Sequence, residues 1–325
     1  MAERARFSAN EIFHEIKYFC CMRFVGVFIG DCGVGRAALW IVVMFLRSFR
    51  VFVALLLVAA APFLFLAACQ SQFIYMPRGY PESAVADWKQ DSGGRALDFT
   101  TSQGRQRAFL QGNLESPRNL WIVCGGNATR ALDWSPWLLE HAPSEDAWLL
   151  VDFPGYGESE GRPTPARIRE SFQKVVPIAA ESVGFSATPD PARLRVFGHS
   201  LGAAACLIAA SEFDIRGGVL LSPFTSTMEM SRRVVGVPLG FLVTHRFDNA
   251  ARLDEILAAG PANFIILHGS HDEVIPVQMG RELTETRLDH VSFIEIEGGR
   301  HNDIAHRHPG PLANALKQAG STGQR

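Results

Sequence analysis

The sequence predicts an α/β domain with a mostly parallel sheet. Short apolar runs rich in Val, Ile and Phe alternate along the chain with longer segments of helical periodicity. These runs are apolar almost throughout, as in strands that helices cover on both faces. Strand–helix alternation of this kind is typical of a parallel sheet between two helical layers.

The expected elements follow this pattern in order. Strands are expected over residues 96–100, 107–111, 120–124, 147–153, 194–197, 218–221, 264–267 and 291–296. A polar turn at 102–104 makes a hairpin of the first two. Helices are expected over 129–141, 164–182, 201–211 and 276–287. Pro165 and Pro276 stand near the start of two of them, where a missing N–H costs little.

A serine follows the fifth expected strand. Gly198-His199-Ser200-Leu201-Gly202 fits the pattern G-x-S-x-G, in which a serine occupies a sharp turn between a strand and a helix. The glycines permit the strained backbone and the close approach of helix to strand. The turn would present the hydroxyl beside the amide of Leu201. An ordinary glycine-rich turn fits these five letters as well, so the motif needs support from the rest of the chain.

Two further reactive residues follow later strands. Asp272 comes after the strand at 264–267, and His301 comes after the strand at 291–296. Ligands of parallel sheets bind at the carboxyl ends of the strands, where Ser200, Asp272 and His301 would meet. A serine needs a neutral imidazole to take its proton, and the imidazole needs a carboxylate to hold its tautomer. Singly, Asp272 could cap a helix and His301 could lie in a surface loop; together they favour a catalytic triad.

The loop after the third strand is the expected second half of an oxyanion hole. It reads Cys-Gly-Gly-Asn-Ala-Thr over 124–129, and its glycines allow the backbone to approach a substrate closely. We assign the amide of Asn127 as the partner of the Leu201 amide, with the amide of Ala128 as the alternative. The same loop could also serve as a turn in which Asn127 or Thr129 caps the next helix.

These motifs resemble a known superfamily over residues 73 to 308. The matching stretches are Phe-Ile-Tyr-Met-Pro at 73–77, Gly-Gly-Asn-Ala at 125–128, Asp-Phe-Pro-Gly-Tyr-Gly-Glu-Ser-Glu-Gly at 152–161, the serine turn, Ser-Pro-Phe-Thr-Ser at 222–226, Arg-Phe-Asp-Asn at 246–249, the Asp272 loop and His-Asn-Asp at 301–303. They resemble the α/β-hydrolases. Within that superfamily they are most similar to the branch of protein-depalmitoylating and lysophosphatidylserine-cleaving hydrolases and their bacterial relatives. Relatives usually carry His-Gly where this chain has Gly125-Gly126, and a small residue where it has Arg300.

The resemblance implies an α/β-hydrolase fold with an eight-stranded sheet and a minimal cap insert at about 223–251. It implies a serine hydrolase of carboxylic ester or thioester acyl bonds that works through an acyl-enzyme intermediate and needs no cofactor. Tyr156 and Phe224 are candidate pocket residues, whereas Asp152 is expected to have a structural, hydrogen-bonding role. A serine peptidase and a non-catalytic binding protein are the alternatives. The insert shows no acidic motif for a substrate amine, and no triad member is missing.

The N-terminal region predicts attachment to a membrane. Arg47 and Arg50 precede an uncharged apolar run over 51–68 that ends in Leu-Ala-Ala-Cys at 66–69. This order resembles a bacterial lipoprotein signal, in which the peptide is cut before the cysteine and Cys69 receives lipid. An uncleaved transmembrane anchor is the alternative, since 18 apolar residues just suffice to span a bilayer.

The domain organisation follows from these segments. Residues 44–68 are the signal peptide or anchor, and 69–325 are the hydrolase domain. Residues 1–43 fit neither, and we expect translation to start at Met44. A membrane-associated amphipathic segment is the other interpretation of 1–43. The catalytic domain would then face the periplasm or the cell exterior.

Composition and charge limit the kinds of partner that we expect. The net charge is −2 at pH 7, and the region after residue 50 is mildly acidic, which argues against nucleic acid. His306 and His308 lie near His301 without the aspartates that a metal-dependent lactonase would need, so no metal is expected. Cys124 and Cys206 are expected to be buried apolar filler. We expect a monomer whose substrate is a small acyl ester or a lipid.

Overall fold

The computed structural model describes residues 34–235 and 243–321. The chain divides into two compact units, Met1–Leu64 and Phe65–Arg325. Most of the expected N-terminal extension, and residues 236–242 of the expected cap insert, lie outside the described residues. The boundary falls a few residues before Cys69, within the segment that the sequence assigns to a signal peptide or anchor.

A single helix runs through the apolar N-terminal segment. This helix, α2, spans Val34–Ile74. Within it, Trp40–Ala61 is long and apolar enough to cross a membrane, a test that a signal sequence also passes. Apolar side chains of this stretch, among them Phe45, Leu55 and Val58, are exposed. Signal peptide and anchor predict the same helix, so both stay predictions.

The second unit is built on an eight-stranded sheet. Its strands are β1 (Arg95–Thr101), β2 (Gly104–Gly112), β3 (Leu120–Cys124), β4 (Ala147–Val151), β5 (Leu194–His199), β6 (Gly217–Leu221), β7 (Asn263–Gly269) and β8 (Val291–Ile296), in the order β1-β2-β4-β3-β5-β6-β7-β8. The hairpin β1–β2 is antiparallel, β2 pairs antiparallel with β4, and all other pairs are parallel. The predicted fold and hairpin are confirmed.

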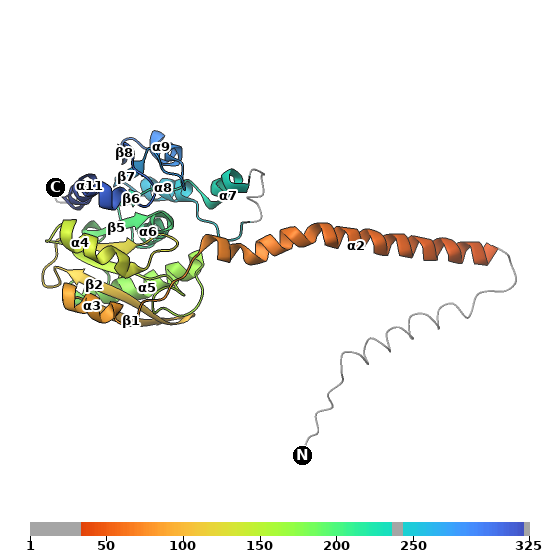
Figure 1. The fold of residues 1–325 in the computed structure, drawn as a ribbon, viewed down its shortest axis with the longest axis horizontal. Helices are drawn as coiled ribbons and strands as arrows, with labels where there is room; N and C mark the ends of the chain where they lie inside the picture. Colours follow the sequence, from red (N-terminus) through yellow and green to blue (C-terminus); the bar gives the residue numbers. More distant parts are fainter. Residues whose placement is uncertain (1–33, 236–242, 322–325) are drawn as a thin grey trace, which may run out of the picture. The chain divides into compact units, whose positions relative to one another are not determined.

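Helices cover both faces of this sheet (Figure 1). One layer consists of α5 (Pro165–Ser182), α6 (Leu201–Glu212), α8 (Asn249–Ala258) and α9 (Val277–Glu285). The other consists of α3 (Ala84–Ser92), the 3₁₀ turn Ala131–Trp134, α4 (Ser135–His141), α10 (Ile304–Arg307) and α11 (Pro309–Ser321). Each layer packs its own apolar cluster against the sheet, which explains why the central strands are buried on both sides.

Several elements differ from the sequence-based expectation. The helix expected over 129–141 is split into a 3₁₀ turn and α4, and Pro136 stands at the start of α4, where its missing N–H is tolerated. The expected helix at 276–287 is shorter, because α9 ends at Glu285. Helices α3, α8 and α11 were not predicted. In the cap insert, α7 spans Thr227–Val235, and Met228 on it is exposed.

Cys124 and Cys206 of the second unit lie in the core, as expected. Cys124 and Cys206 are buried and unbridged. The Cys206 thiol donates to the carbonyl of Phe197 at 3.2 Å. Burial and the neighbouring Cys206 raise the pKa of the Cys124 thiol, so it stays protonated and apolar in character.

Asp152, at the end of β4, ties together two segments near the predicted oxyanion loop. Its carboxylate accepts hydrogen bonds from the Ala131 amide at 2.8 Å and from the Tyr80 hydroxyl at 2.7 Å. The side chain is buried, and this burial raises its pKa to about 7 despite the two donors. These contacts support the structural role expected for it.

This raised pKa predicts a pH-dependent stability. An unfolded aspartate has a pKa of about 4. Between that pH and about pH 7, the folded state therefore holds a proton on Asp152 that the unfolded state has lost. The free energy of unfolding therefore falls as pH rises through this window, by at most about 1.4 kcal/mol per pH unit. Asp152→Asn keeps an acceptor for Ala131 and cannot titrate. Urea titrations at pH 5 to 8 should show wild type losing stability relative to this variant; parallel curves for the two proteins would refute the assignment.

Candidate active site

Ser200 occupies a strained turn between β5 and α6. Its φ is 56° and its ψ is −119°, a conformation that side chains rarely adopt. A Cβ on Gly202 would lie 2.1 Å from the carbonyl oxygen of Cys124, and one on Gly198 would lie 2.4 Å from that of Gly202. Both glycines are therefore required for the helix to approach the strands this closely.

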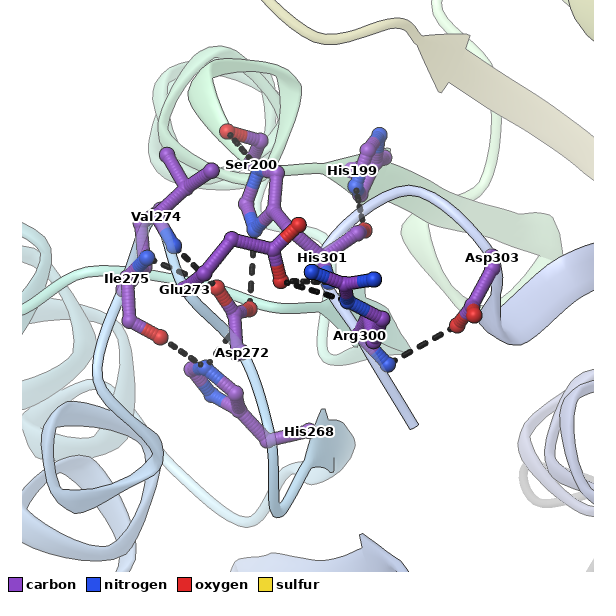
Figure 2. Close-up of polar contacts among 10 residues, drawn as sticks. All are labelled: His199, Ser200, His268, Asp272, Glu273, Val274, Ile275, Arg300, His301 and Asp303. Atoms are coloured by element: carbon purple, nitrogen blue, oxygen red, sulfur yellow. Dashed lines mark hydrogen bonds and ion pairs between the residues drawn. The ribbon is translucent and has the colours of Figure 1, made fainter. Parts of the chain in front are cut away.

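The structure brings Ser200, His301 and Asp272 together (Figure 2). The Nε2 atom of His301 lies 3.0 Å from the Oγ of Ser200, and its Nδ1 lies 2.8 Å from the Oδ2 of Asp272. Ser200 follows β5, Asp272 follows β7 and His301 follows β8. Three residues that lie far apart in the sequence meet here because their strands end at one edge of the sheet.

The Asp272 carboxylate is held by several donors. Its Oδ1 accepts from the amides of Val274 at 2.9 Å and Ile275 at 2.7 Å. Burial alone would raise the pKa of Asp272, but hydrogen bonds from His268 and His301 outweigh it and hold the pKa well below its usual range. Asp272 is therefore ionised, as a partner of an imidazolium must be.

Glu273 is the neighbouring carboxylate, and its position differs. Its Oε2 lies 3.5 Å from the Nε of Arg300 and accepts from the His301 amide at 3.4 Å. No hydrogen bond from the His301 imidazole reaches it in the part of the chain described here. Of the two carboxylates, Asp272 faces the ring.

The glycine-rich loop after β3 lies beside the serine. A Cβ on Gly126 would be 3.6 Å from the Cβ of Ser200, so the peptide joining Gly126 to Asn127 starts next to the nucleophile. The Asn127 carbonyl points elsewhere, because it accepts from the amide of Met76 at 3.0 Å. Across residues 34–235 and 243–321 we find no acceptor for the Asn127 amide, so this amide is available to a substrate oxygen.

Comparisons with known proteins agree with this fold. A model of the alpha/beta hydrolase family matches residues 121–262. The chain belongs to the α/β-hydrolase superfamily.

Several relatives illustrate the extent of this likeness. The chain is 26% identical over 261 residues to the uncharacterized protein Rv2307c of Mycobacterium tuberculosis, covering 79% of this chain and 89% of that protein. It is 28% identical over 153 residues to human alpha/beta hydrolase domain-containing protein 17B, covering 47% of this chain and 49% of that protein. An esterase of Pyrococcus furiosus shares the fold with a TM-score of 0.58 at 15% identity, covering 75% and 95% of the two chains.

Tyr156 and Phe224, the candidate pocket residues, are core residues of this α/β-hydrolase. They are 1% and 5% exposed. The Tyr156 hydroxyl donates to the Asn127 carbonyl at 2.5 Å, and the Phe224 carbonyl accepts from the Asn249 side chain at 2.7 Å. Tyr156 thus contacts the oxyanion loop from inside the protein.

Two histidines of this α/β-hydrolase site were missed by the sequence analysis. The Nε2 of His199 lies 3.0 Å from the carbonyl of His301, and burial lowers the pKa of His199 to about 3. His199 is therefore neutral and donates to the backbone carbonyl of His301. The only sequence signal was its place next to Ser200.

His268, in β7, contacts the carboxylate of Asp272. Its Nε2 lies 2.8 Å from the Ile275 carbonyl and 3.2 Å from the Oδ2 of Asp272, so this nitrogen carries the hydrogen (Figure 2). Its Nδ1 is buried and, among the described residues, has no partner. A strand histidine four residues before the predicted aspartate was the available signal.

The contact predicts that His268 supports catalysis. His268→Met removes the donor and leaves Asp272 Oδ2 with the His301 bond alone, whereas His268→Gln keeps an N–H at a similar reach. A hydrogen bond to a charged group contributes about 1.5–3 kcal/mol, so kcat/KM should fall about 10- to 100-fold in the Met variant. Ester hydrolysis by both variants measures this. Equal activity of the Gln and Met variants would contradict it.

Proposed function

We propose that this protein is a serine hydrolase that cleaves carboxylic ester or thioester acyl bonds through an acyl-enzyme intermediate. The observation that carries the proposal is the continuous chain from Ser200 Oγ through His301 to Asp272, with distances of 3.0 and 2.8 Å, at a strained strand–helix turn. A nucleophile, a base and the group that orients the base are all within hydrogen-bond reach.

The first half-reaction acylates the serine. Ser200 Oγ attacks the acyl carbon while His301 Nε2 takes its proton, and Asp272 stabilises the imidazolium that forms. The developing oxyanion accepts hydrogen bonds from the amides of Leu201 and Asn127. His301 then protonates the departing alcohol or thiol as its bond to the acyl carbon breaks.

The second half-reaction releases the acid. Water gives a proton to His301 Nε2 and attacks the acyl carbon of the ester on Ser200. The same two amides bind the second oxyanion, and the proton returns to Ser200 Oγ as the acid leaves. No cofactor enters either half-reaction, because the triad supplies the nucleophile, the base and the acid.

The triad assignment predicts a graded loss of activity. Ser200→Ala should abolish hydrolysis of p-nitrophenyl acyl esters and labelling by a fluorophosphonate probe, because the nucleophile is gone. Asp272→Asn should lower kcat about 10⁴-fold through the wrong imidazole tautomer. Glu273→Gln is the matched control and should cost far less, since Glu273 does not contact the ring.

Three outcomes would reverse this assignment. Labelling that persists in Ser200→Ala would identify another nucleophile. A larger loss in Glu273→Gln than in Asp272→Asn would identify the other carboxylate. Faster cleavage of aminoacyl amides than of any acyl ester by wild type would favour a peptidase.

We further propose that the protein is attached to a membrane, with the catalytic domain on the periplasmic or extracellular side. The apolar stretch Trp40–Ala61 and the Leu-Ala-Ala-Cys sequence at 66–69 support this. Two or more lipid chains on a cysteine anchor a protein stably. Gln70, and not an aspartate, follows the cysteine, which favours the outer membrane of a Gram-negative cell. A lipid surface beside the site favours acyl-ester or lipid substrates.

Mass spectrometry of the membrane fraction checks the anchor. A mature N-terminus at Cys69 that carries lipid is expected, because the tetrapeptide follows a long apolar run. Cys69→Ser should prevent both cleavage and lipidation. An intact peptide that spans residues 60–75 in the wild-type protein would show an uncleaved anchor instead.

A further inference from the structure

The oxyanion loop is held from outside the sheet by the segment Gln70–Met76, which we call the strap. The strap is the end of α2 and the residues that follow it. The amide of Met76 donates to the Asn127 carbonyl at 3.0 Å. The same amide lies 2.9 Å from the Tyr156 hydroxyl, which itself donates to the Asn127 carbonyl at 2.5 Å. Two donors, the Met76 amide and the Tyr156 hydroxyl, thus meet at one carbonyl of the loop.

This arrangement fixes the direction of the loop's peptides. A trans peptide points its C=O and its N–H in opposite directions. The Asn127 carbonyl and the Ala128 amide belong to one peptide. Because this carbonyl points toward the strap, the Ala128 amide points away from the strap. The hydrogen bonds also restrict rotation about the backbone of Asn127. Gly125 and Gly126 precede this point and offer little restriction of their own. An oxyanion donor must stand within about 2.7–3.1 Å of its target, so such restriction bears on catalysis.

Tyr156 is suited to this role by its surroundings. Its ring is buried and packs edge-on against Phe153, with ring centroids 5.6 Å apart. Burial raises the pKa of its hydroxyl to about 12, so it stays a donor throughout the working pH range. It therefore donates to the Asn127 carbonyl and accepts from Met76 at the same time.

Gln70, at the other end of the strap, and Tyr75 are tied to the later part of the cap insert. The side-chain oxygen of Gln70 accepts from the Thr244 amide at 2.7 Å and from the His245 amide at 3.4 Å. The Tyr75 hydroxyl lies 3.2 Å from the Nδ1 of His245, and the two rings meet edge-on at 5.4 Å. The strap is thus fixed at both ends.

We propose that the strap and Tyr156 form a clamp that positions the oxyanion loop, with Tyr156 and Tyr75 as positioning residues for the proposed acyl transfer. The proposal rests on the proposed function. The strap then has two roles. It connects the predicted lipid-bearing Cys69 to the domain, and it holds part of the proposed catalytic site.

The kinetic test compares the buried Tyr156 with the half-buried Tyr80 in the full chain. Tyr156→Phe should lower kcat about 10-fold with KM nearly unchanged, less than the ~10²-fold loss of a whole donor. The Ki of a trifluoromethyl ketone, whose adduct with Ser200 places an oxyanion in the hole, should rise by a similar factor. Tyr80→Phe is the matched control. It deletes a half-buried hydroxyl that bonds Asp152 and Leu132 but does not contact Asn127.

The control separates positioning from simple loss of stability. Tyr80→Phe should lower Tm without changing the ratio of Ki to KM. Tyr75→Phe removes the contact between the strap and His245. It should lower kcat and raise Ki as Tyr156→Phe does, but by a smaller factor. A Tyr156→Phe protein with lower Tm and wild-type kcat and Ki would overturn the clamp. A Tyr75→Phe protein identical to wild type in kcat and Ki would overturn the positioning role proposed for the strap.

Hydrogen–deuterium exchange gives a readout that needs no turnover. The Met76 amide, which donates to the Asn127 carbonyl and to the Tyr156 hydroxyl, should exchange faster in Tyr156→Phe than in wild type and Tyr80→Phe. Unchanged exchange there would overturn the clamp. A wild-type protein that hydrolyses no acyl ester would overturn the proposed function alone, and the exchange comparison would still decide the clamp.

Discussion

The backbone turn at Ser200 is the constraint on which the rest of the site depends. A residue at φ 56° and ψ −119° stores strain of about 1–3 kcal/mol, and only surrounding structure can hold it there. The Ser200 amide donates to the Leu221 carbonyl at the end of β6 at 2.8 Å, which fixes the turn to the neighbouring strand. The glycines on either side let α6 start directly against the loop after β3. The hydroxyl, the helix N-terminus and the oxyanion loop are thereby brought to one place.

The second requirement is a buried negative charge that stays ionised. Removing a carboxylate from water is costly unless donors replace the water. Asp272 receives two backbone amides and two imidazole N–H groups, and these keep its pKa low. His199 supports the same arrangement from the other side through the His301 backbone. His301 is therefore oriented through both its ring and its main chain.

The sheet, and the places of Ser200, Asp272 and His301 after its strands, could be predicted because each depends on local pattern. Strands β3 and β8 have the predicted bounds. Ser200 directly follows β5, and Asp272 and His301 lie a few residues after β7 and β8. His268 could not be recognised, since a histidine within an apolar strand has the pattern of a core residue. Its role depends on the distance to Asp272, which only the folded loop sets. The pocket role expected of Tyr156 also depended on a side-chain direction that the sequence does not encode locally. The contacts of the strap join residues 51 to 175 positions apart, beyond the reach of any periodicity.

The most direct test of this account is the covalent intermediate itself. Wild-type protein mixed with a p-nitrophenyl ester, quenched in acid within the first turnovers and digested, should yield the peptide containing Ser200 with the mass of the acyl group added. His301→Ala should yield the unmodified peptide under the same conditions, because the base that activates the serine is gone. An acyl group found on another residue, or ester turnover with no acylated peptide at any quench time, would contradict the account.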